Sequence, residues 1–184
     1  MQLTRAILPT PLGDMLALAS DTGLCALEFT GPKRLTRLER RLAKWFPPHE
    51  VVDDVVASGG RSPVIDRTRA WLDRYFAGAS ADVDIPLDMR GAEFERRVWK
   101  ALLKIPAGAT TSYGAIAKSL GSAGASRAVG LANGSNPVAI IVPCHRVLAA
   151  GTSLGGFSAP GGASTKAALL AAEGVLHGEQ ASLF

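Results

Sequence analysis

The chain has 184 residues, of which 47% are hydrophobic and 20% charged, and its 20 glycines and 11 prolines form no low-complexity tract. This composition excludes disordered, collagen-like and coiled-coil proteins and predicts a globular chain of one or two domains. No apolar run reaches the roughly 18 residues of a membrane span, and the first residues lack the pattern of a signal peptide. We therefore expect no membrane association and a cytoplasmic location.

Two cysteines and three histidines are too few for a cysteine-rich zinc cluster, so we expect no metal and no other cofactor. The charge is unevenly distributed, because residues 1–91 carry 12 basic and 12 acidic side chains and residues 92–184 carry 8 and 4. No acidic residue lies between Glu95 and Glu173, which predicts a polyanionic partner for this half. The basic residues of this interval are Arg96, Arg97, Lys100, Lys104, Lys118, Arg127, Arg146 and Lys166.

The first half has the pattern of a small sheet with two helices. Short apolar runs separated by Gly, Pro, Asp and Ser predict hairpin strands, and apolar residues at helical spacing predict helices. The composition changes near residue 89, so we place a boundary between residues 1–88 and 89–184. The predicted elements are strands at 3–8, 15–19 and 24–29, helices at 33–46 and 65–76, and an edge strand at 82–87.

The second half is mainly helical. A first helix is predicted at 94–104, and two short helices at 112–120 and 125–132 are joined by a turn of a few residues. Ser112 is placed as an N-cap and Gly121 as the glycine that follows a helix. This pattern is typical of a helix-turn-helix, although two core helices with a tight connection give the same pattern.

Residues 138–142 are all apolar and predict a buried strand or extended segment that ends beside Cys144. Cys25 lies in an alternating strand and is interpreted as an inert core residue. Cys144 differs because Pro143 precedes it and His145 and Arg146 follow it, with no carboxylate nearby in sequence. These surroundings favour a thiolate, which is the nucleophilic form of cysteine.

Here the chain resembles the O6-alkylguanine-DNA alkyltransferases, whose signature matches residues 143–147. The resemblance is strong over about residues 84–176. It implies an α+β fold, with a small RNase H-like sheet-and-helix domain followed by a mainly helical domain with a winged-helix-like helix-turn-helix. Further matching blocks are Val98-Trp99, Ile105-Pro106-Ala107-Gly108, Thr111-Ser112-Tyr113, Ser126-Arg127-Ala128-Val129-Gly130, Asn136-Pro137 and Leu169-Leu170-Ala171-Ala172-Glu173-Gly174.

The resemblance implies a single-turnover repair protein that flips O6-alkylguanine out of duplex DNA and transfers the alkyl group to Cys144. His145 would take the thiol proton through a water molecule, Glu173 would orient His145, and Asn136 would brace the segment that holds the cysteine. The expected partner is double-stranded DNA, with O4-alkylthymine as a second candidate substrate, and the expected active unit is a monomer.

The resemblance also assigns residues that recognise DNA. Arg127 would fill the gap left by the flipped nucleotide, Tyr113 would push the phosphate and help to hold the base, and the small residues Ala128 and Gly130 would allow a close approach to the minor groove. Val147, Phe157 and Ser158 would line the base pocket.

The loop at 156–162 departs from the family pattern, since it has two additional residues and Phe157 where the family commonly has tyrosine. Glu95 stands where the family usually has glutamine.

Three other functions compete with the alkyltransferase interpretation. An alkyltransferase-like protein would lack the acceptor cysteine, a Cys-His hydrolase usually has the two residues far apart in sequence, and a repressor would read a specific operator.

Overall fold

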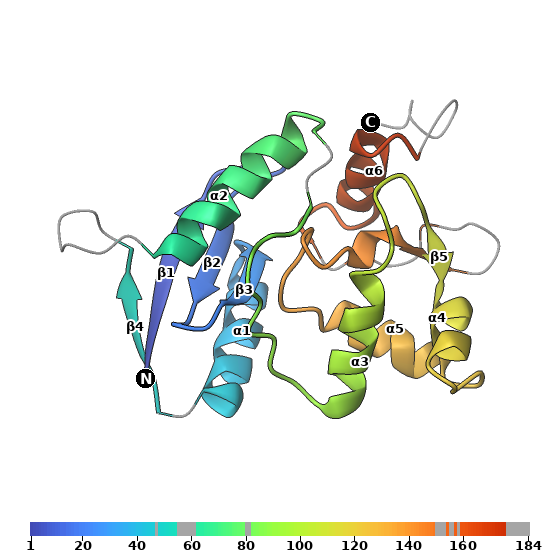
Figure 1. Ribbon diagram of the computed structural model, residues 1–184, viewed down its shortest axis with the longest axis horizontal. Coiled ribbons are helices and arrows are strands. Elements are labelled where there is room, and N and C mark those ends of the chain that lie inside the picture. The colour runs from blue at the N-terminus through green and yellow to red at the C-terminus, as the bar shows by residue number, and fades with distance from the viewer. Residues whose placement is uncertain are drawn as a thin grey trace. The chain divides into compact units, whose positions relative to one another are not determined.

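The computed structural model describes residues 1–46, 48–54, 62–79, 82–149, 154, 157 and 159–175. The chain forms two compact units (Figure 1). The first consists of Met1–Gly91 with Pro137–Ala139, and the second of Ala92–Asn136 with Ile140–Phe184. Within the described residues, no helix combines the length and the hydropathy that crossing a bilayer requires.

The first unit contains a four-stranded sheet with the order β3-β2-β1-β4. β1 pairs antiparallel with β2 and parallel with β4, and β2 pairs antiparallel with β3. The three predicted hairpin strands are confirmed. The fourth was not predicted because its sequence, Glu-Val-Val-Asp, is short and lacks polar–apolar alternation. The strands are β1 (Gln2–Leu8), β2 (Met15–Ala19), β3 (Leu24–Phe29) and β4 (Glu50–Asp53).

Two helices complete the first unit and confirm both predicted helices: α1 (Pro32–Trp45) and α2 (Pro63–Phe76). Leu38 and Leu42 of α1 pack with Phe46 against buried residues of the sheet, which include Leu3 and Leu18. α2 begins at the N-cap Ser62, whose hydroxyl accepts from the amide of Ile65, and it packs against β1 and β2.

The predicted edge strand at 82–87 is wrong, and so is the strand alternative for the buried segment 138–142. In the segment 82–87 only Leu87 forms a bridge, with Leu24, because Pro86 has no amide hydrogen to donate to a ladder. The approach is close enough that a Cβ on Gly23 would lie 2.6 Å from the carbonyl oxygen of Pro86. The segment 138–142 is buried as expected, but only its first residue bridges, to Leu27 of β3, and the following residues turn. Ile140 has a φ of 70°, which is incompatible with a strand.

The second unit is mainly helical and has a two-stranded parallel sheet formed by β5 and β6. α3, α4 and α5 pack together, and the buried Trp99 Nε1 donates to the carbonyl of Ala132 at 2.8 Å. Ser112 caps α4 by accepting from the amide of Ala115, and Gly121 has the left-handed φ of 74° predicted for it. The elements are α3 (Glu93–Leu102), β5 (Thr111–Ser112), α4 (Tyr113–Ser119), α5 (Ser126–Gly134), β6 (Val147–Leu148) and α6 (Ala163–Ala172).

Candidate active site around Cys144

Cys144 opens a single 3₁₀ turn that ends at Arg146, directly before β6. Two buried asparagine side chains hold the backbone of this segment. Asn136 Nδ2 donates to the carbonyl of Val142 at 2.7 Å, and Asn133 Nδ2 donates to the carbonyl of Cys144 at 3.3 Å. The cysteine is therefore presented by a backbone that is held from two sides. Asn133 was not singled out from the sequence.

Glu173 lies at the C-terminal end of α6 and joins His145 to Arg146. His145 Nε2 lies 2.8 Å from Glu173 Oε1, and the two side chains are 0% and 2% exposed. Arg146 Nε lies 2.8 Å from Glu173 Oε2, and Arg146 Nη2 lies 2.9 Å from Oε1. A third guanidinium nitrogen of Arg146 donates to the carbonyl of Ile105 at 2.5 Å. The carboxylate is thus bound bidentately by an arginine while it contacts the histidine.

Burial lowers the pKa of His145 below its usual value, and the hydrogen bond and charge of Glu173 only partly oppose this effect. His145 is therefore neutral at pH 7. Because a carboxylate can only accept, the hydrogen lies on His145 Nε2 and the lone pair on Nδ1. Among the described residues, Nδ1 has no hydrogen-bond partner, so it is available to accept a proton.

Lys166 is fully buried, and its ammonium group donates to the carbonyl of Val147 at 2.6 Å and to that of Leu154. Burial lowers the pKa of Lys166 to about 8, and the charge of Cys144 opposes this effect by raising the pKa. Sequence reasoning missed this role, although the spacing of Lys166 from Leu169 and Leu170 places all three on one helix face. Arg146 was also missed as the partner of Glu173.

The structure therefore corrects part of the charge analysis. Of the eight basic residues between Glu95 and Glu173, Arg146 is bound to Glu173 and Lys166 is buried. Neither presents its charge to a polyanion at the surface, because the first is neutralised and the second is satisfied by carbonyls. The other six are exposed.

Tyr113 begins α4 and is half-buried, and its pKa is raised by burial and by the charge of Cys144. The tyrosine and the cysteine therefore lie within electrostatic range of each other. Gly130 of α5 faces the tyrosine, since a Cβ there would lie 4.0 Å from Tyr113 Cδ1. Val147 is buried and Phe157 is partly buried, whereas Ser158 lies outside the described residues.

One face of α5 is exposed and contains few polar groups. Arg127 and Ala128 are exposed, and Leu131, one turn further along, is 75% exposed. The opposite face packs inward through Val129 and Ala132. The predicted finger residue and one of the small residues are thus brought together on an exposed surface of the same helix whose Asn133 holds the Cys144 backbone.

The fold and the site define a class: a sheet domain joined to a helix-turn-helix domain in which a buried histidine and glutamate accompany a cysteine. The chain belongs to the 6-O-methylguanine DNA methyltransferase family. The family's ribonuclease-like domain matches residues 3–89, and its DNA-binding domain matches residues 93–175.

Individual relatives agree with this assignment. A methylated-DNA–protein-cysteine methyltransferase of Methanosarcina acetivorans is 39% identical over 170 residues, which cover 92% of this chain and 97% of the relative. A Mycobacterium tuberculosis protein of the same name is 58% identical over 102 residues, 55% of this chain, and the match spans 61% of the length of that relative. A crystal structure of Mycobacterium tuberculosis OGT in complex with DNA matches this fold with a TM-score of 0.71. The two sequences are 35% identical, and the match covers 100% of this chain and 99% of the OGT chain.

Proposed function

We propose that this protein repairs DNA by transferring the alkyl group of O6-alkylguanine irreversibly to the sulfur of its own Cys144. The observation that carries the proposal is the hydrogen bond between His145 and Glu173, which places the ring hydrogen on Nε2 and leaves Nδ1 of the buried imidazole available to accept a proton. A nucleophile needs a base, and the base needs a group that orients it. Arg146 holds the carboxylate of Glu173 in place for that purpose through two hydrogen bonds.

The chemistry balances within the protein and the damaged base. The Cys144 thiol gives its proton to His145 Nδ1 through a water molecule, and the thiolate attacks the alkyl carbon. A sulfur–carbon bond forms while the carbon–O6 bond breaks, and the electron pair stays on the base, which takes up one proton to become guanine. The product is a thioether, so each chain reacts once. The cationic Lys166 stabilises the thiolate through their charge interaction.

The alkylated base must leave the duplex because its O6 lies inside the stack, and extrusion costs a few kcal/mol. Arg127 occupies the vacated position, and Ala128 and Gly130 allow α5 to approach the minor groove. Support comes from the exposed face of α5, which offers one long cation among small and apolar residues. Such a surface has few groups that could read base edges, so scanning is independent of sequence.

The remaining assignments complete the proposal. Tyr113 helps to hold the flipped base, and its coupling to Cys144 is consistent with that position. Val147, Phe157 and Ser158 line the base pocket, and Asn136 braces the cysteine segment. A single chain is the active unit, and O4-alkylthymine is a second substrate to be tested.

Intact-mass spectrometry after incubation with a duplex that contains O6-methylguanine tests this function. We expect one added methylene unit per chain, located in the peptide that contains Cys144, and no further product when excess duplex is supplied. Repeated turnover would indicate a hydrolase, and a label on Cys25 would show that the nucleophile is misassigned. An unmethylated duplex of the same sequence is the control.

A further inference from the structure

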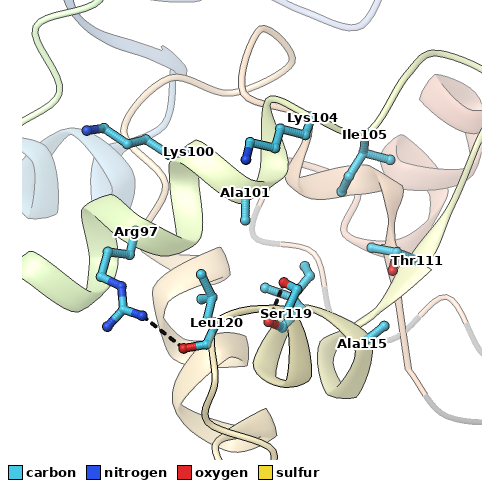
Figure 2. A pocket seen from close by; sticks show the side chains of 10 residues that line it. Arg97, Lys100, Ala101, Lys104, Ile105, Thr111, Ala115, Ser119 and Leu120 are labelled. Carbon is cyan, nitrogen blue, oxygen red and sulfur yellow. Dashed lines mark hydrogen bonds between the residues drawn. The ribbon is translucent and has the colours of Figure 1, made fainter.

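A groove of about 490 Å³ runs between α3 and α4 of the second unit (Figure 2). Three of its lining residues are the cations Arg97, Lys100 and Lys104, and none of the described lining residues is acidic. Ala115 and Ser119 lie on the wall formed by α4. The side chains that line this groove belong neither to the residues around Cys144 nor to the exposed face of α5.

The three cations form a row that begins on α3. Arg97 and Lys100 lie about one turn apart on one face of the helix, and Lys104 follows in the turn two residues after the helix ends. All three are exposed, and within the described part of the chain none of them forms an ion pair. Arg97 Nη2 donates to the carbonyl of Leu120 at 2.9 Å, which holds its guanidinium at one end of the groove. The row is therefore a positive surface without compensating acidic groups.

The groove lies on the side of α3 and α4 that faces away from α5. Trp99, which donates to Ala132 of α5, lies roughly 130° around α3 from the midpoint of Arg97 and Lys100. On α4, Tyr113 contacts α5 near Gly130, whereas Ala115 and Ser119 point to the groove. A duplex held on the exposed face of α5 therefore does not fill the groove.

We propose that this groove binds the phosphodiester backbone of a second DNA segment while α5 holds the first. In the part of the chain that the structure describes, its lining contains no aromatic residue on which bases could stack, so the cations contact phosphates and not bases. Flexible lysine side chains suit this task because they act as point charges toward phosphate oxygens. The inference rests on the proposed function, in which α5 binds the first segment. A protein held by two segments can pass directly from one to the other.

The test measures the rate at which the full-length protein leaves a fluorescent undamaged duplex when an unlabelled duplex is added. We expect this rate to rise several-fold with the competitor concentration, and to become independent of it in the double variant Lys100→Gln, Lys104→Gln. The double variant Arg40→Gln, Lys44→Gln removes the same charge from exposed positions of α1, outside the groove, and should retain the dependence. Lys104→Gln alone should reduce the log–log salt slope of the competitor-dependent rate by about 0.9.

The second site would be overturned if the release rate of the parent protein did not depend on the competitor concentration. It would also be overturned if the Lys100→Gln, Lys104→Gln variant kept that dependence. An equal effect of poly-glutamate in place of the competitor duplex would overturn it as well, and would indicate an acidic protein partner. Methyl transfer to Cys144 is followed in parallel by intact mass. Transfer without competitor dependence contradicts only the second site, and competitor dependence without transfer contradicts only the proposed function.

Discussion

Cys25 and Cys144 are both buried, at 1% and 7% exposure, and their surroundings give them different chemistry. Burial raises the pKa of Cys25 to about 11, and the nearby charge of Asp88 adds to this effect. Cys144 lies next to His145 in the chain and within electrostatic range of Lys166. Burial alone disfavours the thiolate form of a cysteine, whereas a base and a cation buried beside the thiol favour it.

The largest expected effect comes from removing each thiol in turn. Cys144→Ala should abolish methyl transfer because no other sulfur lies beside a base, and it should still bind duplex DNA. Cys25→Ala should keep nearly the whole transfer rate. Intact mass and fluorescence anisotropy measure the two properties. The distinction between the two cysteines would be contradicted if the Cys144→Ala variant still accepted methyl groups. It would also be contradicted if a folded Cys25→Ala variant lost methyl transfer.

The second effect concerns the carboxylate behind the base. Glu173→Gln can still accept from His145 Nε2 but lacks the charge that favours a protonated His145. We therefore expect the reaction with free O6-benzylguanine to slow by about 10²-fold near neutral pH and to recover partly as pH rises. The exposed Glu93→Gln is the matched control. A parental rate across pH 6 to 9 would reduce Glu173 to a structural residue.

The parent protein should show a related pH dependence. Because the pKa of His145 is lowered from its usual 6.5, the transfer rate should persist below pH 6.5 and fall only as pH drops through the lowered pKa, where the imidazole becomes protonated. The contribution of the neutral, buried imidazole to stability is likewise present above pH 6.5 and lost through the same lower range. Thermal unfolding across this range measures the second quantity.

A variant of α5 separates the reactivity of Cys144 from its access to DNA. Arg127→Ala should slow transfer from duplex DNA by at least about tenfold, because the vacated position in the stack is no longer filled. Transfer from free O6-benzylguanine should be unchanged, since the free base needs no extrusion. Equal losses on both substrates would place Arg127 in support of the fold or of the thiol.

The smallest effect tests the inert cysteine. Asp88→Asn removes a charge that opposes the Cys25 thiolate, so labelling of Cys25 by a thiol reagent should accelerate by roughly two- to threefold in a Cys144→Ala background. Asp88 also accepts hydrogen bonds from Ser20 and Arg90, so circular dichroism must show that the variant is folded. An acceleration that rivals the reactivity of Cys144 would show that local charge outweighs burial.

Local sequence patterns predicted most of the helices and the hairpin strands, because both depend on the spacing of apolar residues and on turn residues. The failures occur where long-range contacts decide. β4 becomes a strand by pairing with β1, about 50 residues away in sequence. The segment 138–142 has strand composition, yet it turns after its first residue pairs with β3.

The candidate site shows the same division. Cys144 and His145 stand in one short motif and could be found directly, whereas Glu173 was assigned through the family resemblance. The bond between Arg146 and Glu173 could not be predicted, because nothing in the sequence indicates which of eight cations turns inward. Lys166 was counted with the surface charges since lysine is rarely buried without partners, and its partners are backbone carbonyls.

The position of Glu173 also has a consequence for biosynthesis. The carboxylate follows His145 by 28 residues and ends the last helix among the described residues. A nascent chain therefore exposes its cysteine and histidine before the helix that orients the histidine has left the ribosome. Under the proposed function, the thiol gains an oriented base only after α6 has been synthesised and packed, so reactivity toward alkylated DNA should appear only as the second unit folds.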